Sequence, residues 1–277
     1  IGLGIVYREV GNSILSKRHY ELAKKIGEDE KREDYVAISY NNLGNLYKQL
    51  GEYDKAIAFL QLALTSFEKF GEERFISDAL EGMGEVYAEI NNNQRAIDYF
   101  SQSISIAESL SDNYRLLSRY ANIAKSYADS DDKEKALMYF SKTTELAQSI
   151  GDKSRLSEVL IMISDFYKMN NDTENALLNL KESLIISKEV GDTVSIASAL
   201  NSLSEIYFQR KNYNEAYKNA FESYKISSQK NLMNTLAQSS FSISRILEIQ
   251  GNFKDALYYY RIHKKTQHIL LNTEKIR

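Results

Sequence analysis

The chain has 277 residues, of which 35 are Lys or Arg, 38 are Asp or Glu, and none is Cys, Pro or Trp. Without cysteine there can be no disulfide, thiol nucleophile or cysteine-ligated metal centre. The net charge of −3 creates no overall field that would attract nucleic acid, and no apolar run is long enough to span a membrane.

Four kinds of residue recur at intervals of 40 along the whole chain, which indicates an internal repeat. Relative to each repeated tyrosine, an apolar residue stands four positions earlier and a small residue three positions earlier. Another small residue stands nine positions after the tyrosine. We expect the small residues to let helices approach closely and the tyrosines to fill the space between helix pairs. The tyrosine position comprises Tyr7, Tyr47, Tyr87, Tyr127, Tyr167, Tyr207 and, in the seventh copy, Leu247.

Each copy is predicted to form two helices. In the second copy, Tyr40, Leu43 and Tyr47 follow the three- and four-residue spacing of one helical face. A turn at 51–54 separates this helix from the next one, and Gly71 separates the second copy from the third. Helices of roughly 16 residues are marginal alone in water, so stacking must stabilise them. The acid after each break between copies is expected to cap the next helix: Glu72, Asp112, Asp152 and Asp192.

The first junction departs from this pattern. Gly27 stands four residues before the position that corresponds to Gly71, and the charged stretch 28–34 follows it. We therefore expect the second helix to end early and a solvated linker to replace its last turn.

The segment NNLGNLYKQLGEYDKAIAFLQLAL, residues 41–64, resembles the tetratricopeptide repeat, and the resemblance extends over essentially the whole chain. Copies of 40 residues resemble those of kinesin light chain, of the Pins family and of bacterial signalling proteins. The resemblance implies an all-α fold, a right-handed α-solenoid of about seven helix pairs. It also implies that the first helices line a concave groove that binds peptides or protein segments.

We expect a single solenoid over 1–277, whose last helix continues to residue 277 as an exit helix. Helices that fill nearly the whole chain account for the absence of proline. The expected copies span residues 1–34, 35–74, 75–114, 115–154, 155–194, 195–230 and 231–270.

No catalytic or metal-binding motif is present, so we expect neither enzymatic activity nor a cofactor. The three histidines lack metal-ligand spacing, and His263 and His268 are expected to be exposed on the last helix. A chaperone-gripping carboxylate clamp is also disfavoured, because the basic residues that it needs are missing.

The polar positions of the first helices form the predicted binding face. Asparagines there can hydrogen-bond an extended peptide through donor and acceptor at once. These candidate residues are Asn41, Asn42, Asn45, Lys48, Asp78, Glu81, Glu85, Glu89, Asn122, Lys125, Asp165, Lys168, Asn201 and Glu205.

Within this face, the acidic residues of the third copy form a stripe along one side of a helix: Asp78, Glu81, Glu85 and Glu89. Like charges so placed cost only about 0.2–0.5 kcal/mol per pair, so two interpretations stay open. The stripe belongs to a ladder of ion pairs, with Lys48 and Lys125 as neutralising partners, or it is a docking site for a basic or amine-bearing segment.

The sequence therefore predicts a non-catalytic, cytoplasmic scaffold that binds a protein or peptide, does not bind nucleic acid and has no membrane span. Both ends look truncated, and residues 258–277 resemble the exit helix of bacterial proteins that continue into a coiled coil and an output domain. We expect the sensor or regulatory module of a larger bacterial signalling protein. The alternative is a stand-alone receptor for short signalling peptides, of the pheromone-responsive regulator type.

Overall fold

The computed structural model describes the backbone of residues 1–276 and the side chains of residues 1–270. Fourteen α-helices and no strand occur in this part of the chain, which confirms the predicted all-α solenoid of helix pairs. No helix among the described residues is long and apolar enough to cross a membrane. The chain divides into two compact units, Ile1–Lys142 and Thr143–Ile276.

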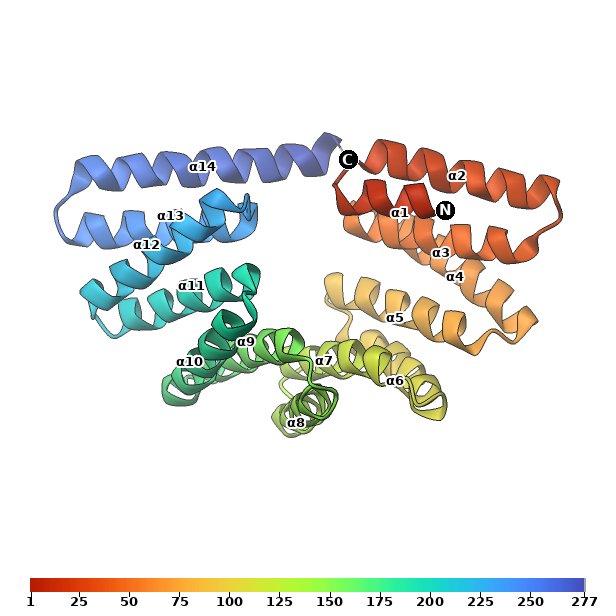
Figure 1. Ribbon diagram of the computed structural model, residues 1–277, viewed down its shortest axis with the longest axis horizontal. Helices are drawn as coiled ribbons and strands as arrows, with labels where there is room; N and C mark the ends of the chain where they lie inside the picture. Colours follow the sequence, from red (N-terminus) through yellow and green to blue (C-terminus); the bar gives the residue numbers. More distant parts are fainter. Residues whose placement is uncertain (277) are drawn as a thin grey trace. The chain divides into compact units, whose positions relative to one another are not determined.

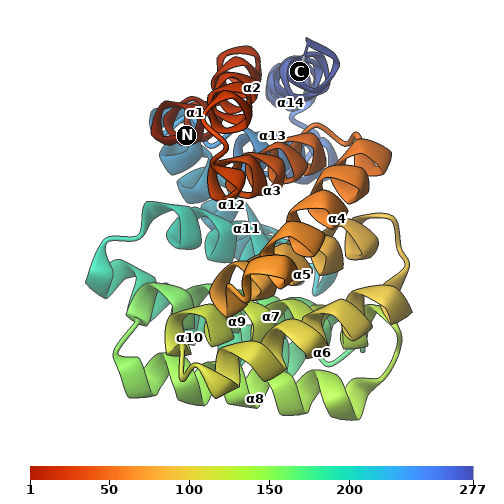
Figure 2. The same cartoon turned by 90° about the vertical axis from the view of Figure 1, so that its right-hand side faces the viewer.

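In the first unit, successive helices run antiparallel and each packs against the next, as α3 to α6 show (Figures 1 and 2). The first helix is short and the others have 17 or 18 residues. The boundary between the units falls within α8, Lys133–Ile150. The preceding helices are α1 Gly2–Glu9, α2 Ser13–Asp29, α3 Glu33–Gln49, α4 Tyr53–Phe70, α5 Glu73–Glu89, α6 Asn93–Ser109 and α7 Asn113–Asp129.

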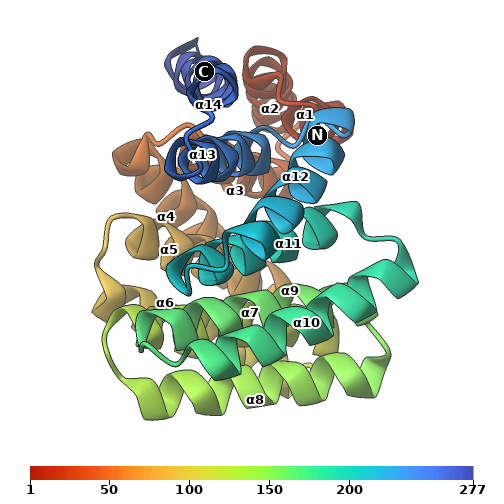
Figure 3. The same cartoon turned by 90° about the vertical axis from the view of Figure 1, so that its left-hand side faces the viewer.

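The second unit repeats this arrangement, with each helix from α9 to α13 packed against the next one (Figure 3). Its last helix has 24 residues and reaches Ile276, whereas Arg277, where we expected the exit helix to end, lies outside the described residues. The helices after α8 are α9 Lys153–Met169, α10 Thr173–Val190, α11 Thr193–Gln209, α12 Tyr213–Gln229, α13 Met233–Ile249 and α14 Phe253–Ile276.

A residue with left-handed backbone ends the helices at intervals of 20 residues. Glycine adopts this conformation most easily, and Asn, Asp, Ser and Lys replace it at several junctions. These residues are Gly11, Lys31, Gly51, Gly71, Asn91, Ser111, Asp131, Gly151, Asn171, Gly191, Lys211, Asn231 and Gly251.

The residue after each left-handed position is the N-cap of the following helix. Asp112, Asp152 and Asp192 accept backbone N–H groups, as predicted. The prediction for Glu72 was wrong, because its side chain makes no capping bond. Glutamate is one methylene longer than aspartate and is not among the side chains that fit this position well.

The expected linker after Gly27 was also wrong. Helix α2 continues through Gly27 to Asp29, and the chain breaks at Lys31, where φ is 56°. A methyl group at Gly27 would lie 3.0 Å from Val36 on α3 and 3.1 Å from the carbonyl oxygen of Arg32. This glycine therefore permits a close helix contact, and the repeat keeps its spacing at the first junction.

The repeated tyrosines of the first unit lie within helix pairs. Tyr47 stacks on Phe59 with ring centroids 5.4 Å apart, and Tyr87 stacks on Tyr99 at the same distance. Both partners stand twelve residues further along, on the second helix of the same pair. The expectation that the tyrosines fill the space between pairs therefore holds only in part: these two rings stack within pairs, whereas Tyr167 and Tyr207 of the second unit pack against a cluster that joins neighbouring pairs.

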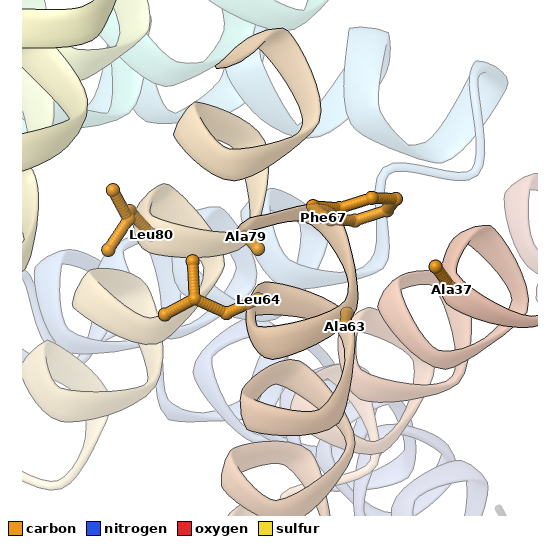
Figure 4. Packing of buried hydrophobic residues seen from close by; sticks show 6 residues of the cluster. All are labelled: Ala37, Ala63, Leu64, Phe67, Ala79 and Leu80. Atoms are coloured by element: carbon orange, nitrogen blue, oxygen red, sulfur yellow. The ribbon is translucent and has the colours of Figure 1, made fainter. Parts of the chain in front are cut away.

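Buried aliphatic and phenylalanine side chains also fill the space between pairs. Around α4 they form one buried cluster with α3 and α5 (Figure 4): Ala37, Ala63, Leu64, Phe67, Ala79 and Leu80. A cluster of the same kind joins α10 to α11 in the second unit and includes Leu177, Leu180 and Leu203. Burying such side chains is worth about 1.5–3 kcal/mol each, which single helices of this length cannot obtain alone.

A second buried contact also recurs within helix pairs. A side chain on the second helix bonds to a carbonyl oxygen of the first helix, 26 residues earlier, as Ser103 does to Ser77 and Ser223 to Ala197. At the same position His263 is buried, with Nδ1 2.9 Å from the carbonyl oxygen of Ala237. The expectation that His263 is exposed was wrong because it occupies this buried hydrogen-bonding position.

Close approach within a pair predicts the effect of Gly84→Ala. The added methyl group would lie 2.6 Å from the Phe100 ring, so the pair must separate. We expect a loss of about 1–3 kcal/mol in the free energy of unfolding, measured by urea denaturation. Gly2→Ala, where nothing lies within 4 Å, should cost nothing. Equal stability of the two variants would contradict this account of the small position.

The left-handed junctions predict a reciprocal pair of effects. Lys31→Gly should stabilise the protein by about 1 kcal/mol, because glycine has no Cβ to oppose the positive φ. Gly71→Lys, at the same repeat position, should destabilise it by a similar amount. Thermal unfolding of both variants checks the prediction, and a shift of the same sign in both would contradict it.

Candidate functional site

The predicted residues of the second and third copies, with the exception of Glu89, meet in one cleft of the first unit. It lies on the first-helix face, by which we mean the polar face of the first helices of the pairs. The cleft has a volume of about 440 Å³. Its lining includes Arg8 from α1, Asn41, Asn42, Asn45, Lys48 and Gln49 from α3, Asp78, Glu81, Gly82 and Glu85 from α5, and Ser118 from α7.

Two arginines of α7 form ion pairs with the first two residues of the acidic stripe, Asp78 and Glu81. Arg115 donates two hydrogen bonds to Asp78, at 2.8 and 2.9 Å. Arg119 donates to the same carboxylate at 2.9 Å and forms an ion pair with Glu81 at 3.0 Å. The sequence interpretation assigned neither arginine to the stripe.

Arg119 is the most completely buried charged side chain described, with 1% of its surface exposed. Besides the two carboxylates, its Nε donates to the hydroxyl groups of Ser77 and Ser103. One of its terminal nitrogens also donates to the carbonyl oxygen of Arg115 at 3.0 Å. Ser, Ala or Val occupies this repeat position in the following and preceding copies, so a basic residue there was a signal that sequence reasoning could have used.

Lysine from α3 holds the next acid of the stripe. Lys48 forms an ion pair with Glu85 and donates to Oδ1 of Asn45 at 3.2 Å. Asn122 of α7 donates to Glu81 and Glu85 at 3.3 and 3.4 Å. Three of the four acids in the stripe therefore have basic partners within the protein.

Burial raises the pKa of Glu81, and the charge of Arg119 opposes this shift.

Two residues that were expected to belong to the ladder of ion pairs take no part in it. Glu89 is exposed on α5 and Lys125 is exposed on α7, and neither forms an ion pair among the described residues. The ladder interpretation thus holds with Arg115, Arg119 and Lys48 as partners, and Lys125 takes no part in it.

Two asparagines carry buried carbonyl oxygens that accept no hydrogen bond among the described residues: Oδ1 of Asn41 and Oδ1 of Asn201. The two residues occupy the same position of the repeat, one in each unit. Buried polar atoms are nearly always hydrogen-bonded, so two such atoms at one repeat position indicate a shared cause.

The predicted residues of the fifth and sixth copies meet in the second unit. Lys168 contacts Asp165 and Glu205, each at 3.1 Å. Burial alone would lower the pKa of Lys168, but the two carboxylates outweigh it and raise the value. Nδ2 of Asn201 lies 3.5 Å from Oε1 of Gln238. The described residues contain no cluster of His, Asp and Glu side chains that could hold a metal ion.

The family model described as tetratricopeptide repeat matches residues 1–69, 35–109 and 75–149, which together exceed half of the chain. No curated protein sequence matches. A Rap protein complexed with competence and sporulation factor has a similar structure, with 14% identity and a TM-score of 0.71, over 98% of this chain and 74% of that one.

Two further solved structures resemble this chain. NprR in complex with its cognate peptide NprX has 18% identity and a TM-score of 0.56, over 82% of this chain and 67% of that one. A STAND signal-transduction ATPase with a tetratricopeptide repeat sensor, PH0952 from Pyrococcus horikoshii, has 21% identity and a TM-score of 0.63. That match covers 94% of this chain and 45% of the ATPase. Identities this low show the fold alone.

The buried network around Arg119 predicts a pH-dependent loss of stability. Arg119→Met leaves Asp78 and Glu81 without their buried partner, which should cost about 3–5 kcal/mol at neutral pH. Because burial already raises the pKa of Glu81, loss of the arginine raises it further. Protonation then relieves the uncompensated charge, so the loss should shrink as the pH falls toward the ordinary value of 4.5.

Urea denaturation across this pH range measures the effect. Arg115→Met is the matched control on the same helix: its side chain is 32% exposed, so the cost should be about 1 kcal/mol or less. A loss for Arg119→Met that is independent of pH would contradict the electrostatic explanation.

Proposed function

Because the chain belongs to the tetratricopeptide repeat family, we propose that it is a non-catalytic module that binds an extended peptide or protein segment on its first-helix face. The observation that carries this proposal is the 440 Å³ cleft, whose lining includes the amide side chains of Asn41, Asn42 and Asn45. Asn201 occupies the same repeat position as Asn41 in the second unit. The similarity to NprR, which was solved with a peptide, supports the choice of ligand.

An extended backbone is the ligand that best fits these asparagines. An asparagine side chain that lines the cleft can accept from the ligand's N–H groups and can also donate to its carbonyl groups. Such bonds need no particular side chain on the ligand. They would hold a segment by its main chain and leave selectivity to neighbouring residues of the protein.

The charges of the cleft favour a ligand that is not strongly basic. Asp78, Glu81 and Glu85 already have cationic partners at hydrogen-bonding distance. A basic segment would have to displace Arg115, Arg119 or Lys48 and leave a cation unpaired. The ion pairs therefore shape and neutralise this wall of the cleft.

A peptide-binding module of this kind can regulate an output domain to which it is attached. We propose that ligand binding on this face regulates a larger signalling protein, and the likeness to the ATPase with a repeat sensor supports this choice. A stand-alone peptide receptor is the alternative, which the likeness to NprR supports. The cytoplasmic location, the coiled coil and the output domain stay predictions.

Selection from a display library of random peptides tests the proposal. Peptides that bind the wild-type chain should lose about tenfold in affinity for Asn41→Ala, because one hydrogen bond to the main chain is lost. The same substitution should not lower the thermal stability, since Oδ1 of Asn41 has no partner among the described residues. Isothermal titration and thermal unfolding measure the two effects.

Asn179→Ala is the matched control, because Asn179 lies on a second helix and bonds only to the carbonyl oxygen of Asn175 among the described residues. It should leave peptide affinity unchanged. If no peptide is selected above background, or if Asn41→Ala binds the selected peptides as tightly as wild type, the proposed site is wrong.

A further inference from the structure

The first-helix face of the second unit contains a pocket with a volume of about 330 Å³, formed between α11 and α13. Its walls combine rings, an aliphatic side chain and polar groups, and no residue of it except Glu205 was singled out from the sequence. The lining includes Ser204, Glu205, Phe208, Gln209, Lys211, Tyr213, Ser242, Arg245 and Ile249.

Arg245 is the feature that sets this pocket apart. Its guanidinium carbon lies 4.2 Å from the ring centroid of Phe208 and 5.6 Å from that of Phe241. Both distances are within the range of cation–π contacts. Among the side chains that the structure describes, no carboxylate forms an ion pair with Arg245.

The repeat explains how the arginine comes to lack an acid. Residues 37 apart on successive first helices face each other, and at two places the pair is Lys–Glu: Lys48 with Glu85 and Lys168 with Glu205. At the next corresponding place, the pair is Phe208 with Arg245. A ring thus stands where these two copies supply a lysine, and a guanidinium stands where they supply a carboxylate.

Stacking on aromatic rings leaves the edge of the guanidinium available. The guanidinium is planar, and its N–H groups lie in the plane as a fork that matches a carboxylate. A bidentate pair of this kind is stronger than hydrogen bonds between neutral groups. The hydroxyl of Ser242 lines the same pocket and adds a further donor.

The surroundings favour a monoanion beside an apolar group. Glu205 lines the pocket and is held by Lys168 at 3.1 Å, so a dianionic phosphate would meet a nearby negative charge. Phe208, Tyr213 and Ile249 can contact an apolar side chain. The C-terminal residue of a peptide carries a single negative charge next to its side chain, which fits both features.

We propose that this pocket binds the C-terminal carboxylate of a peptide ligand, with Arg245 as the residue that recognises it. The inference rests on the proposed function, because it concerns the end of a peptide bound on the first-helix face of the second unit. It concerns residues other than Asn41 and the cleft of the first unit, so the two proposals can fail separately.

Titration with N-acetyl-alanyl-phenylalanine and with its C-terminal amide tests the assignment. The probes differ only in the carboxylate, and the Nε–H signal of Arg245 can be followed by NMR. We expect the free acid to bind at least about tenfold more tightly than the amide and to shift this signal. Arg245→Gln should abolish the preference, and Arg245→Lys should retain only part of it.

Lys230→Gln is the matched control, because it removes the same charge from an exposed position in the turn before α13. It should leave the preference for the acid unchanged. Equal affinity for acid and amide would overturn the proposal, as would an unchanged preference in Arg245→Gln.

Two further probes separate other sources of the anion. N-acetyl-glutamic acid α-amide offers only a side-chain carboxylate, and inorganic phosphate offers no carboxylate. Tighter binding of either one than of the free-acid dipeptide would overturn the assignment to a C-terminus. If the selected peptides still depend on Asn41 while these results are negative, the proposed function stands and this inference alone falls.

Discussion

Register between neighbouring helices is the constraint on which the rest of the structure depends. Helices of 17 or 18 residues gain too little from their own hydrogen bonds, so each must present its apolar face to the next one. A left-handed residue at every twentieth position ends each helix at the same place in the repeat. Because equivalent side chains then lie at equivalent places on every helix, three contacts recur: the stacked tyrosines, the serine-to-carbonyl bonds and the contacts between residues 37 apart.

Electrostatics then distinguishes one copy from another within this regular frame. Arg119 occupies a position that is otherwise small or apolar, and there it binds two carboxylates that face the cleft. Lys48 binds the third one from the opposite helix. Where the paired charges give way to a ring and a guanidinium, at Phe208 and Arg245, the surface acquires a cation with spare donors. The polar character of the face is thus set copy by copy.

The fold could be predicted from the sequence because its signals are periodic. The 40-residue interval, the small positions and the turn residues together specify helix pairs, and the helix bounds agree with them. Errors arose where one residue type serves two roles. Gly27 permits close packing although glycine also ends helices, and His263 occupies a buried serine position.

The candidate site was less predictable, because charge pairing depends on which side chains reach across helices. Spacing along α5 identified the acidic stripe, but only the packing of α7 against it shows that Arg115 and Arg119 are the partners. Lys125 had the right charge and repeat position but is exposed. The unpartnered oxygens of Asn41 and Asn201 are likewise properties of burial, which sequence alone does not give.

The uniform spacing of the left-handed junctions also bears on how such a chain can change length. One residue inserted within α5 would turn the following side chains by about 100° about the helix axis. Asp78 would then no longer share a face with Glu85, and the acids would lose their partners on α3 and α7. Duplication of a whole 40-residue unit preserves every junction and every face. Gain or loss of complete helix pairs is therefore the path of least disruption by which this architecture lengthens or shortens.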